Sequence, residues 1–463
     1  MVQSSPEHSR RPWGLAWRCS VWYITSGIEF CVTTDLLVYS LIVPVLPFQL
    51  EHLGYTGVSG LVGWLLFAYS SGIVLFTPPI AYLSEKYNAR QIPLLCGQVA
   101  LVGAQIMLML APTYWLMVIA RLLQGLSSSV IWVAGLALIC DTVPERSVGQ
   151  QLGLAMSGLS LGFLVGPPVA GALFSRFGFH GPFIFGIVVT MVDLVGRLFI
   201  IERKDALRWG ARPLSETRLA APQSTQDGGT ERIAVPSPLS LAPERRSPFY
   251  IAIGKLVTSS RAIAVCASTL MYGMILASQE PALPLHLQAI WKLNASKVGI
   301  VYIAAVVPTL FSSALAGWWI DKRGTALITI AALSFSLPWI VLLTINSSLA
   351  FFIVMFALEN FGVSATVSAL TAELASTTKI LEGVGYAHVY GAFNMAYGVG
   401  SALGPIIGGQ MYDHLDRGWM AICLFGTGLI VASMILTFAY FEDKPMLNRL
   451  VARIRRKREE SGS

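Results

Sequence analysis

The sequence predicts an all-α membrane protein of twelve transmembrane helices, arranged as two pseudo-symmetric halves of six helices each. Hydrophobic residues make up 54% of the chain and charged residues only 12%, whereas soluble domains carry about 25% charged residues. Twelve segments are apolar over roughly the 20 residues that a membrane-spanning helix needs. A glycine-rich phrase also occurs twice, which indicates that the second half repeats the first.

The N-terminal half is expected over residues 24–201, after a polar and basic tail at residues 1–23. Its six apolar segments lie at about 24–48, 58–83, 91–111, 114–138, 149–174 and 181–201. A segment rich in Ser, Pro, Gly, Gln and Arg follows at residues 202–261. Because it holds few apolar residues to offset the entropy of ordering, we expect a mostly disordered linker.

The C-terminal half is expected over residues 262–441 and shows the same alternation of apolar segments and short polar loops. Its six apolar segments lie at about 262–287, 298–320, 326–345, 349–373, 383–412 and 419–441. A basic tail at residues 442–463 ends the chain. We expect this tail to lie on the anionic cytoplasmic leaflet.

The distribution of basic residues predicts the orientation of the chain. An even number of spans puts both tails on one side of the membrane. That side, with the linker and the even-numbered loops, holds 26 of the 32 Lys and Arg residues. Cytoplasmic loops of membrane proteins are enriched in these residues, so both tails and the linker are expected in the cytosol.

Two sequons for N-glycosylation, Asn294-Ala-Ser and Asn346-Ser-Ser, fall in loops that this topology places outside the cytosol. Glycans are attached on that side, so Asn294 and Asn346 are candidate glycosylation sites, with Asn346 in the tighter loop. The alternative is a chance occurrence of a short motif.

The repeated phrase lies in the fifth and eleventh expected helices. The first copy supplies Gly162, Gly166, Pro167 and Gly171. The second copy, at a constant offset of 238 residues, supplies Gly400, Gly404, Pro405 and Gly409. Small residues at four-residue spacing let helix backbones approach closely. An internal repeat of this kind in a membrane chain is typical of secondary transporters.

Two loops, after the second and the eighth expected helix, resemble a signature of the major facilitator superfamily. The first copy reads Ala81-x-x-x-Glu85-Lys86 and the second Gly317-x-x-x-Asp321-Lys322-Arg323-Gly324. The first copy departs from the family's pattern, with Ala81 and Glu85 where Gly and Asp are usual. The resemblance implies gating roles for a set of loop residues: Glu85, Lys86, Arg90, Asp321, Lys322 and Arg323.

Two further phrases narrow this resemblance. Arg121-Leu-Leu-Gln124-Gly125 resembles the superfamily's intramembrane arginine motif, and the first glycine phrase resembles its antiporter motif. The chain is similar to the drug:proton antiporters, especially the vesicular amine transporter branch, and to fungal metabolite and drug efflux carriers. Where amine transporters carry a Lys in helix 2 and an Asp in helix 11, this chain has Ser70 and Asn394. Both members of that ion pair are thus neutral together, which leaves no charge unpaired.

Charges inside the expected spans are candidates for function, because a charge near the bilayer centre costs at least about 2.5–3.5 kcal/mol. Asp35 lies about eleven residues into helix 1 and Arg121 about seven residues into the antiparallel helix 4, which puts them at similar depth. We expect a pair, direct or through water, in which Asp35 loads and releases a proton. The alternative is a static pair that only locks the two helices.

Further charges lie in the sixth, seventh and tenth helices. Glu280 precedes Pro281, and a proline breaks a helix locally, as at midplane binding sites. Glu280 is expected to bind a proton or a cationic substrate; the alternative is a solvated residue near the outer mouth. Glu359 either lines the cavity or packs between helices. Asp193 and Arg197, four residues apart, are expected to pair with each other.

One face of the eleventh helix carries Tyr390, Asn394 and Tyr397 at three- and four-residue spacing. Rings with polar tips suit a cavity for an aromatic or polycyclic compound, so Tyr390 and Asn394 are candidate substrate residues. Tyr69 and Trp132 could join them from other helices. The same face serves helix packing equally well.

No phrase typical of ATP binding or hydrolysis occurs in the sequence, which lacks P-loop, HExxH, GxSxG and clustered Cys/His sets. We therefore expect a transporter rather than an enzyme, with no cofactor and no metal. Its partners are a small-molecule substrate, protons and membrane lipid, without nucleic acid, and it is expected to be monomeric.

The function that these residues favour is a proton-coupled antiporter that exports a small organic compound, drug or secondary metabolite from the cytosol by alternating access. The alternatives are vesicular or vacuolar loading of an amine-like compound and a facilitator or nutrient importer of the same fold. A channel or receptor is the rival of another class. We expect the plasma membrane as its location, with a vacuolar or vesicular membrane as the alternative.

Overall fold

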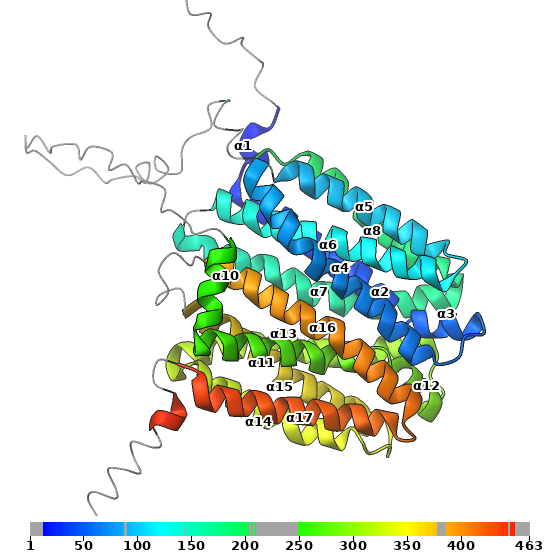
Figure 1. Ribbon diagram of the computed structural model, residues 1–463. Coiled ribbons are helices and arrows are strands. Elements are labelled where there is room, and N and C mark those ends of the chain that lie inside the picture. The colour runs from blue at the N-terminus through cyan, green and yellow to red at the C-terminus, as the bar shows by residue number, and fades with distance from the viewer. Residues whose placement is uncertain are drawn as a thin grey trace, which may run out of the picture.

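The computed structural model describes residues 13–87, 90–143, 145–202, 206, 209, 249–376, 386–442 and 445–449. These residues form one bundle of long helices that lie side by side (Figure 1). Two short helices, α1 (Leu15–Arg18) and α10 (Phe249–Thr258), lie at one end of the bundle, which we call the terminal side. Two others, α3 (Leu46–His52) and α12 (Leu283–Trp291), lie at the other end, which we call the opposite side.

Each half contributes six membrane-length units. The N-terminal units are α2 (Val21–Ile42) with α3, α4 (Val58–Tyr87), α5 (Gln91–Met109), α6 (Tyr114–Thr142), α7 (Glu145–Phe177) and α8 (His180–Leu198). The C-terminal units are α11 (Ser260–Gln279) with α12, α13 (Ala295–Arg323), α14 (Thr325–Leu342), α15 (Leu349–Ser376), α16 (Tyr386–His414) and α17 (Gly418–Tyr440). The predicted fold class is confirmed.

Eleven of these units are long and apolar enough to cross a membrane by length and composition, counted over the described residues. The remaining unit, α16, has 29 residues and packs against α4 of the other half and α11 of its own half. Its glycines and polar residues, which include Asn394 and Ser401, make it less apolar than the others.

The first and seventh units are each broken towards the opposite side. The interruption between α2 and α3 contains Pro44, and the one between α11 and α12 contains Pro281. A proline lacks the N–H that an uninterrupted helix requires and clashes with the preceding turn. The break expected at Pro281 is therefore present, with a counterpart in the other half.

The repeated glycines bring helices within each half into close contact, as their spacing predicts. A Cβ atom at Gly162 of α7 would lie 2.7 Å from the Cβ of Leu36 on α2. A Cβ atom at Gly404 of α16 would lie 3.0 Å from the carbonyl oxygen of Met274 on α11. Any side chain at these positions would push the paired helices apart. The fifth and eleventh units thus pack in equivalent ways against the first and seventh.

The last glycine of each copy faces the other half of the molecule. A Cβ atom at Gly171 of α7 would lie 2.8 Å from the Cα of Ser296 on α13. A Cβ atom at Gly409 of α16 would lie 3.1 Å from the Cα of Gly60 on α4. Ser296 and Gly60 belong to the first turns of helices that begin on the opposite side. The pairs α7–α13 and α4–α16 therefore hold the halves together there.

Two apolar side chains beside the proline breaks also cross between the halves. Phe48 of α3 packs against the core of the C-terminal half, which contains Phe352 and Trp419. Leu285 of α12 belongs to the core of the N-terminal half, which contains Leu46. With the glycine contacts, these exchanges close the two halves against each other on the opposite side.

The expectation of a disordered linker over residues 202–261 is wrong at its C-terminal end. The apolar run from Phe249 to Thr258 forms α10, and α11 begins at Ser260, before the expected start at residue 262. Ser259 caps α11 by accepting a hydrogen bond from the N–H of Ala262 at 3.4 Å. Residues 203–205, 207–208 and 210–248 lie outside the described residues, as do residues 1–12 and 450–463 of the two tails.

Candidate functional site

Asp35 lies fully buried on α2, where its carboxylate binds two side chains of α6. The Ser128 hydroxyl donates to Oδ2 at 2.5 Å and the Trp132 indole N–H donates to the same oxygen at 3.1 Å. The Tyr69 hydroxyl of α4 lies 3.0 Å from the Ser128 hydroxyl. Since Ser128 uses its one proton towards Asp35, Tyr69 is the donor of that second bond. A chain of hydrogen bonds thus runs from Tyr69 on α4 through Ser128 on α6 to Asp35 on α2.

The direct pair expected between Asp35 and Arg121 is not formed in this structure. The guanidinium of Arg121 donates from Nη1 to Gln124 at 2.9 Å and lies over the rings of Tyr39 and Tyr69, 5.4 and 5.5 Å from their centroids. Such cation–π contacts stabilise a buried guanidinium. Ser128, two helical turns further along α6, takes the place that Arg121 was expected to hold beside Asp35.

Two nitrogens of the Arg121 guanidinium do not use their hydrogen-bonding capacity within the described residues. Its side chain is fully buried, yet Nε and Nη2 have no hydrogen-bond partner among the described residues. Unpaired buried donors are rare in native proteins and cost about 1–3 kcal/mol each. The free N–H groups of Arg121 can therefore receive an acceptor from water or from a ligand.

Glu280 lies in the break between α11 and α12 and is partly buried. Its Oε2 accepts a hydrogen bond from the Tyr39 hydroxyl at 2.5 Å. Tyr39 belongs to α2, so this bond joins the two halves of the molecule. The charge of Arg121 also acts on Glu280. Glu280 is thus held inside the bundle, in contrast to the alternative of a solvated residue at the outer mouth.

Glu359 is fully buried on α15 and is held within the C-terminal half. Its carboxylate accepts from the side-chain amides of Gln279 and Asn360, each at 3.0 Å. Gln279 is the last residue of α11 and directly precedes Glu280. The contacts of Glu359 therefore fix the end of α11 at the point where the polar site begins.

Two tyrosines bring these groups into one site. The rings of Tyr39 and Tyr69 lie 4.7 Å apart, with the Arg121 guanidinium over both. Tyr69 is connected through Ser128 to Asp35 of the N-terminal half. Tyr39 is bonded directly to Glu280 of the C-terminal half. The site therefore links one acid from each half to a single shared cation.

Three residues of the site were not predicted from the sequence: Tyr39, Ser128 and Gln279. The positions of Tyr39 and Ser128 in the sequence do indicate that they belong to the site. Tyr39 lies four residues after Asp35, and Ser128 lies seven residues after Arg121, so each shares a helix face with a charge. Tyr69 and Trp132, which could join the helix 11 tyrosines, both belong to the surroundings of Asp35, and Tyr69 also lies within electrostatic reach of Tyr397 on α16.

The helix 11 candidates are described only in part. The side chain of Tyr390 lies outside the described part of the structure. Asn394 and Tyr397 are partly buried on α16, and the Tyr397 ring lies 5.9 Å from that of Tyr272 on α11. Ser70, at the position of the amine transporters' Lys, donates to the carbonyl of Ser401 on α16 at 3.2 Å.

The candidate gating loops lie on the terminal side. Arg90 pairs with Asp141 of α6 at 2.9 Å and donates to Ser84 at 2.5 Å. Lys322 lies over the ring of Trp318, 3.5 Å from its centroid, and the Arg323 side chain is exposed. The side chains of the other three candidates lie outside the described residues: Glu85, Lys86 and Asp321.

Acidic residues after the last helix of each half cap a neighbouring helix in both halves. Glu202 accepts from the backbone N–H of Gln91 at 2.6 Å, at the start of α5. Glu442 accepts from the N–H of Ala326 at 3.3 Å, at the start of α14. A carboxylate is favourable at a helix N-terminus. This repeated contact was not anticipated, although the two residues lie 240 positions apart.

The remaining predicted charges form a structural pair. Arg197 Nε lies 3.5 Å from Asp193 Oδ1 on α8, and both side chains are buried. Gln98 of α5 also donates to Asp193. The expected pairing is confirmed. No group of three or more His, Cys, Asp or Glu side chains able to hold a metal ion occurs in the described part of the chain.

Both sequons lie on the opposite side, with exposed asparagines. Asn294 caps α13 by accepting from the N–H of Lys297 at 3.1 Å. Asn346 lies 3.1 Å from Nε2 of the buried His286. Asn346 is therefore already engaged in a hydrogen bond through the side chain that a glycan would modify.

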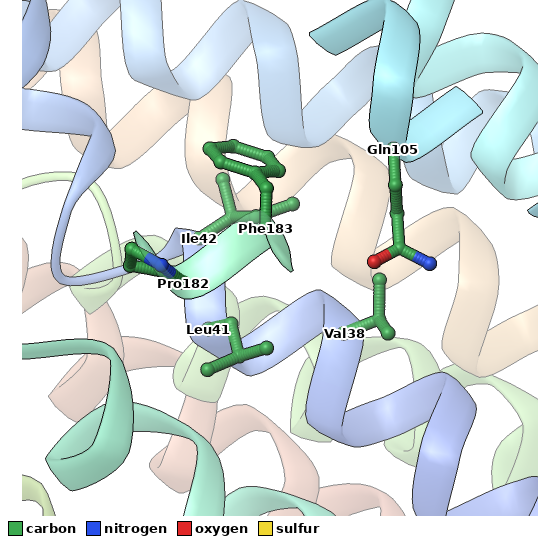
Figure 2. A pocket seen from close by; sticks show the side chains of 6 residues that line it. All are labelled: Val38, Leu41, Ile42, Gln105, Pro182 and Phe183. Carbon is green, nitrogen blue, oxygen red and sulfur yellow. The ribbon is translucent and has the colours of Figure 1, made fainter. Parts of the chain in front are cut away.

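A small void between α2, α5 and α8 is separate from the polar site (Figure 2). Its volume is about 10 Å³, and it is lined by Val38, Leu41, Ile42, Gln105, Pro182 and Phe183. A water molecule needs about 10–15 Å³ of such volume. The void is a packing gap within the N-terminal half rather than a substrate site.

Two segments of the chain, residues 28–278 and 263–460, match the family described as Major Facilitator Superfamily. An uncharacterized MFS-type transporter of Schizosaccharomyces pombe is 25% identical over 448 residues, covering 92% of this chain and 97% of the relative. The MFS-type transporter ppzB of Metarhizium rileyi is 25% identical over 450 residues, covering 88% and 93%. The synaptic vesicular amine transporter of Bos taurus is 25% identical over 362 residues, covering 77% of this chain and 62% of that protein.

Solved structures share the fold. A bacterial homolog of the human lysosomal transporter Spinster, in an inward-facing and unoccupied conformation, matches with a TM-score of 0.63 at 13% identity, covering 90% of this chain and 94% of that one. The human organic anion transporter MFSD10 (TETRAN) matches with a TM-score of 0.62 at 16% identity, covering 90% and 99%. At these identities the likeness concerns the fold alone.

Proposed function

Because this chain belongs to the major facilitator superfamily, and hence is a multi-pass membrane transporter, we propose that it is a proton-coupled antiporter. It exports a small organic compound, drug or secondary metabolite from the cytosol by alternating access of its two halves. One observation carries this proposal: an acid from each half, Asp35 and Glu280, is linked through tyrosines to the shared Arg121. Charges at such depth are costly and mark ion or substrate pathways.

The contacts of the two acids suit proton binding. Asp35 and Glu280 each bind a hydroxyl group, from Ser128 and Tyr39 respectively. A hydroxyl can donate to a carboxylate and accept from a carboxylic acid, so neither protonation state leaves a bond unmade. The amide nitrogens around Glu359 only donate, so these contacts favour its carboxylate form over its protonated form. We therefore assign protons to Asp35 and Glu280, and positioning of α11 to Glu359.

Substrate recognition is assigned to the same region. Arg121 offers N–H groups to an acceptor on the substrate, while Tyr390 and Asn394 of α16 remain candidates for an aromatic or polar part. The names of similar proteins cover both signs of charge, with an amine transporter among the relatives and an organic anion transporter among the structures. We propose an aromatic or polycyclic organic compound as the substrate.

Loading of a vacuole or vesicle is the second candidate. The likeness to vesicular amine transporters over 77% of this chain favours it. Proton antiport would drive either export from the cell or accumulation in an acidic compartment, with the same residues. Ser70 and Asn394 replace the Lys and Asp of the amine branch, so we place export ahead of amine loading.

Alternating access is supported by the way the halves meet. They are closed on the opposite side through Gly171, Gly409 and the exchanged side chains of Phe48 and Leu285. We propose that the halves rock about the polar site, with the glycine phrases allowing helices to slide at close range. The terminal-side loops, with the Arg90–Asp141 pair, are proposed to gate the other face.

We propose that the terminal side faces the cytosol, since most Lys and Arg residues belong to it. Asn294 and Asn346 then lie on the side where glycans are attached. A mobility shift on glycosidase treatment that the Asn294→Gln variant lacks would support this orientation. An epitope at the C-terminus that antibodies reach on intact cells would contradict it.

Flux in vesicles with an imposed pH gradient tests the function, using compounds identified by metabolite profiling of a deletion strain. Accumulation should vanish when a protonophore collapses the gradient. The Asp35→Asn variant should lose it, whereas Asp416→Asn, which changes an exposed acid, should retain it. Flux that ignores the protonophore would indicate a facilitator or channel, and proton-driven uptake by Asp35→Asn would remove Asp35 from the mechanism.

A further inference from the structure

Side-chain hydrogen bonds between the two halves end mostly on carboxylates. Among the described residues there are four such bonds, of which Ser70 makes one with a backbone carbonyl. In the other three, Asp413 accepts from the Gly60 N–H at 2.6 Å, Glu51 accepts from Gln288 at 3.1 Å, and Glu280 accepts from Tyr39 at 2.5 Å. Closure on the opposite side therefore depends on acidic groups.

The bond to Glu280 differs from the other two in its surroundings. Glu51 is exposed and Asp413 half-buried at the surface, where ionic and hydrogen-bonding contributions are small. The Tyr39–Glu280 bond lies inside the bundle, and Tyr39 is 6% exposed. Hydrogen bonds to a charged acceptor are roughly twice as strong as neutral ones, and low local polarity strengthens them further.

The Tyr39 side chain has little freedom to seek another partner. Its ring lies 4.7 Å from that of Tyr69 and 5.9 Å from that of Phe163, with the Arg121 guanidinium over its face. These contacts aim the hydroxyl across the boundary between the halves. A phenol carries one proton, so the strength of this link depends on whether Glu280 is a carboxylate or a carboxylic acid.

Charged and titratable groups surround Glu280 from several helices. Arg121 of α6 is the cation that acts on it, and the hydroxyls of Tyr302 on α13 and Tyr397 on α16 lie within its electrostatic reach. The Tyr302 hydroxyl has no hydrogen-bond partner among the described residues. Only Tyr39 connects Glu280 to the other half by a hydrogen bond that the structure records.

We propose that Tyr39 is the positioning residue that makes closure of the opposite side depend on the proton at Glu280. When Glu280 is ionised, the Tyr39 bond and the nearby Arg121 hold the halves together. When Glu280 takes a proton, the link to Tyr39 becomes a weaker bond between neutral groups, and the opposite side opens more readily. The proposed dependence of closure on the proton rests on the proposed role of Glu280 as a proton site. It gives the Tyr39 hydroxyl a function in addition to the packing of its ring.

Tyr69 provides a matched control for Tyr39. Both rings are buried and lie against Arg121, and both carry a hydroxyl that leads towards an acid. The Tyr69 hydroxyl, however, binds Ser128 within the N-terminal half. Tyr39→Phe and Tyr69→Phe each remove one hydroxyl and keep the ring, but only Tyr39→Phe removes a bond between the halves.

Distances between spin labels on the opposite side test the proposal without any substrate. Cysteines replace the exposed Trp115 of α6 and Ile345 after α14, one in each half, in the full chain with its native cysteines removed. In lipid nanodiscs, the wild-type background should show a longer distance whose population rises by about tenfold relative to the closed state between pH 8 and pH 5.5.

The variants give the decisive comparison. Tyr39→Phe should lose most of this pH response, leaving the part due to Asp413 and Glu51, whereas Tyr69→Phe should keep it. Glu280→Gln should likewise keep only the part of the pH response due to Asp413 and Glu51, and adding Tyr39→Phe to it should leave that residual response unchanged. A wild-type response in Tyr39→Phe, or additive effects in the double variant, would overturn the proposal.

Failure of this inference can be told apart from failure of the proposed function. If Tyr39→Phe abolishes the pH response while vesicles show no proton-driven flux, the switch exists but the antiport assignment is wrong. If flux is proton-driven while Tyr39→Phe keeps the wild-type pH response of the distances, the antiport assignment stands and the switch at Tyr39 is wrong. Where Tyr39→Phe is not stably folded, as judged by thermal unfolding, Glu280→Gln with Tyr39 intact decides by the same readout.

Discussion

Single residues inside the bundle carry charge in two different arrangements. Asp193 and Arg197 lie within ion-pair distance of each other. Asp35, Glu280 and Arg121, in contrast, have no charged side chain within ion-pair distance among the described residues, and each relies on hydroxyls, amides or aromatic rings. A paired charge stabilises a packing arrangement, whereas an unpaired one is able to change its state or partner.

This difference predicts how the paired charges respond to substitution. Arg197→Leu leaves Asp193 buried without its cation and should cost about 3–5 kcal/mol in the free energy of unfolding. Combining it with Asp193→Asn should restore most of that loss, because no charge is then stranded. Thermal unfolding in detergent measures both. Arg449→Leu, which breaks an exposed pair with Glu442, should cost at most about 1 kcal/mol.

A double variant as unstable as Arg197→Leu alone would contradict this account of the pair. Loss of proton-driven flux in the double variant would also contradict the account, because the Asp193–Arg197 pair would then contribute to transport and not only to packing.

The depths of the functional charges could be predicted from the sequence, but not which side chains touch them. Arg121 and Ser128 are separated by two helical turns on one face of α6, so the residue pattern allows either of them to meet Asp35. The choice depends on the axial position of α6 against α2. That position is fixed by packing of the whole half, which a single sequence does not specify.

Elements of the two halves pair according to the repeated glycines. The first glycines of each phrase hold the fifth and eleventh units against the first and seventh, and Gly171 and Gly409 hold the halves together. The spacing predicted close packing, and this is confirmed. It could not predict that one glycine of each copy serves the boundary between halves, because that depends on which neighbour each helix face meets.

The glycine contact predicts a specific effect on closure. Gly171→Ala should separate α7 from α13 and cost about 1–3 kcal/mol, as overpacking does, with a larger open population on the opposite side. The spin-label distance across the halves and thermal unfolding measure this. Gly103→Ala in α5, where a Cβ atom meets nothing within 4 Å, is the control and should leave both unchanged. If Gly171→Ala and Gly103→Ala had the same spin-label distances and the same unfolding temperature, Gly171 would not be the contact that holds α7 against α13.

Element boundaries were predictable where composition changes sharply. The proline breaks of the first and seventh units follow from Pro44 and Pro281. Helix α10 was missed because its ten residues lie at the edge of a polar segment and are too few to read as a span.

At the scale of the whole molecule, two related halves enclose one polar site and are closed on one side. The twelve units follow from hydropathy and the repeat, and the family follows from the loop and arginine motifs and is confirmed. The closed side could not be predicted, because a sequence compatible with alternating access must favour several arrangements of its halves by small margins. The structure supplies one of these arrangements.

The central claim is that protons move through this site in exchange for substrate. Vesicles loaded with a pH-sensitive dye, with a gradient of the transported compound and no initial pH gradient, test it most directly. The wild-type chain should move protons in the direction opposite to the compound, and Asp35→Asn and Glu280→Gln should each uncouple the two movements. Transport of the compound by the wild-type chain with no change in internal pH would contradict the account.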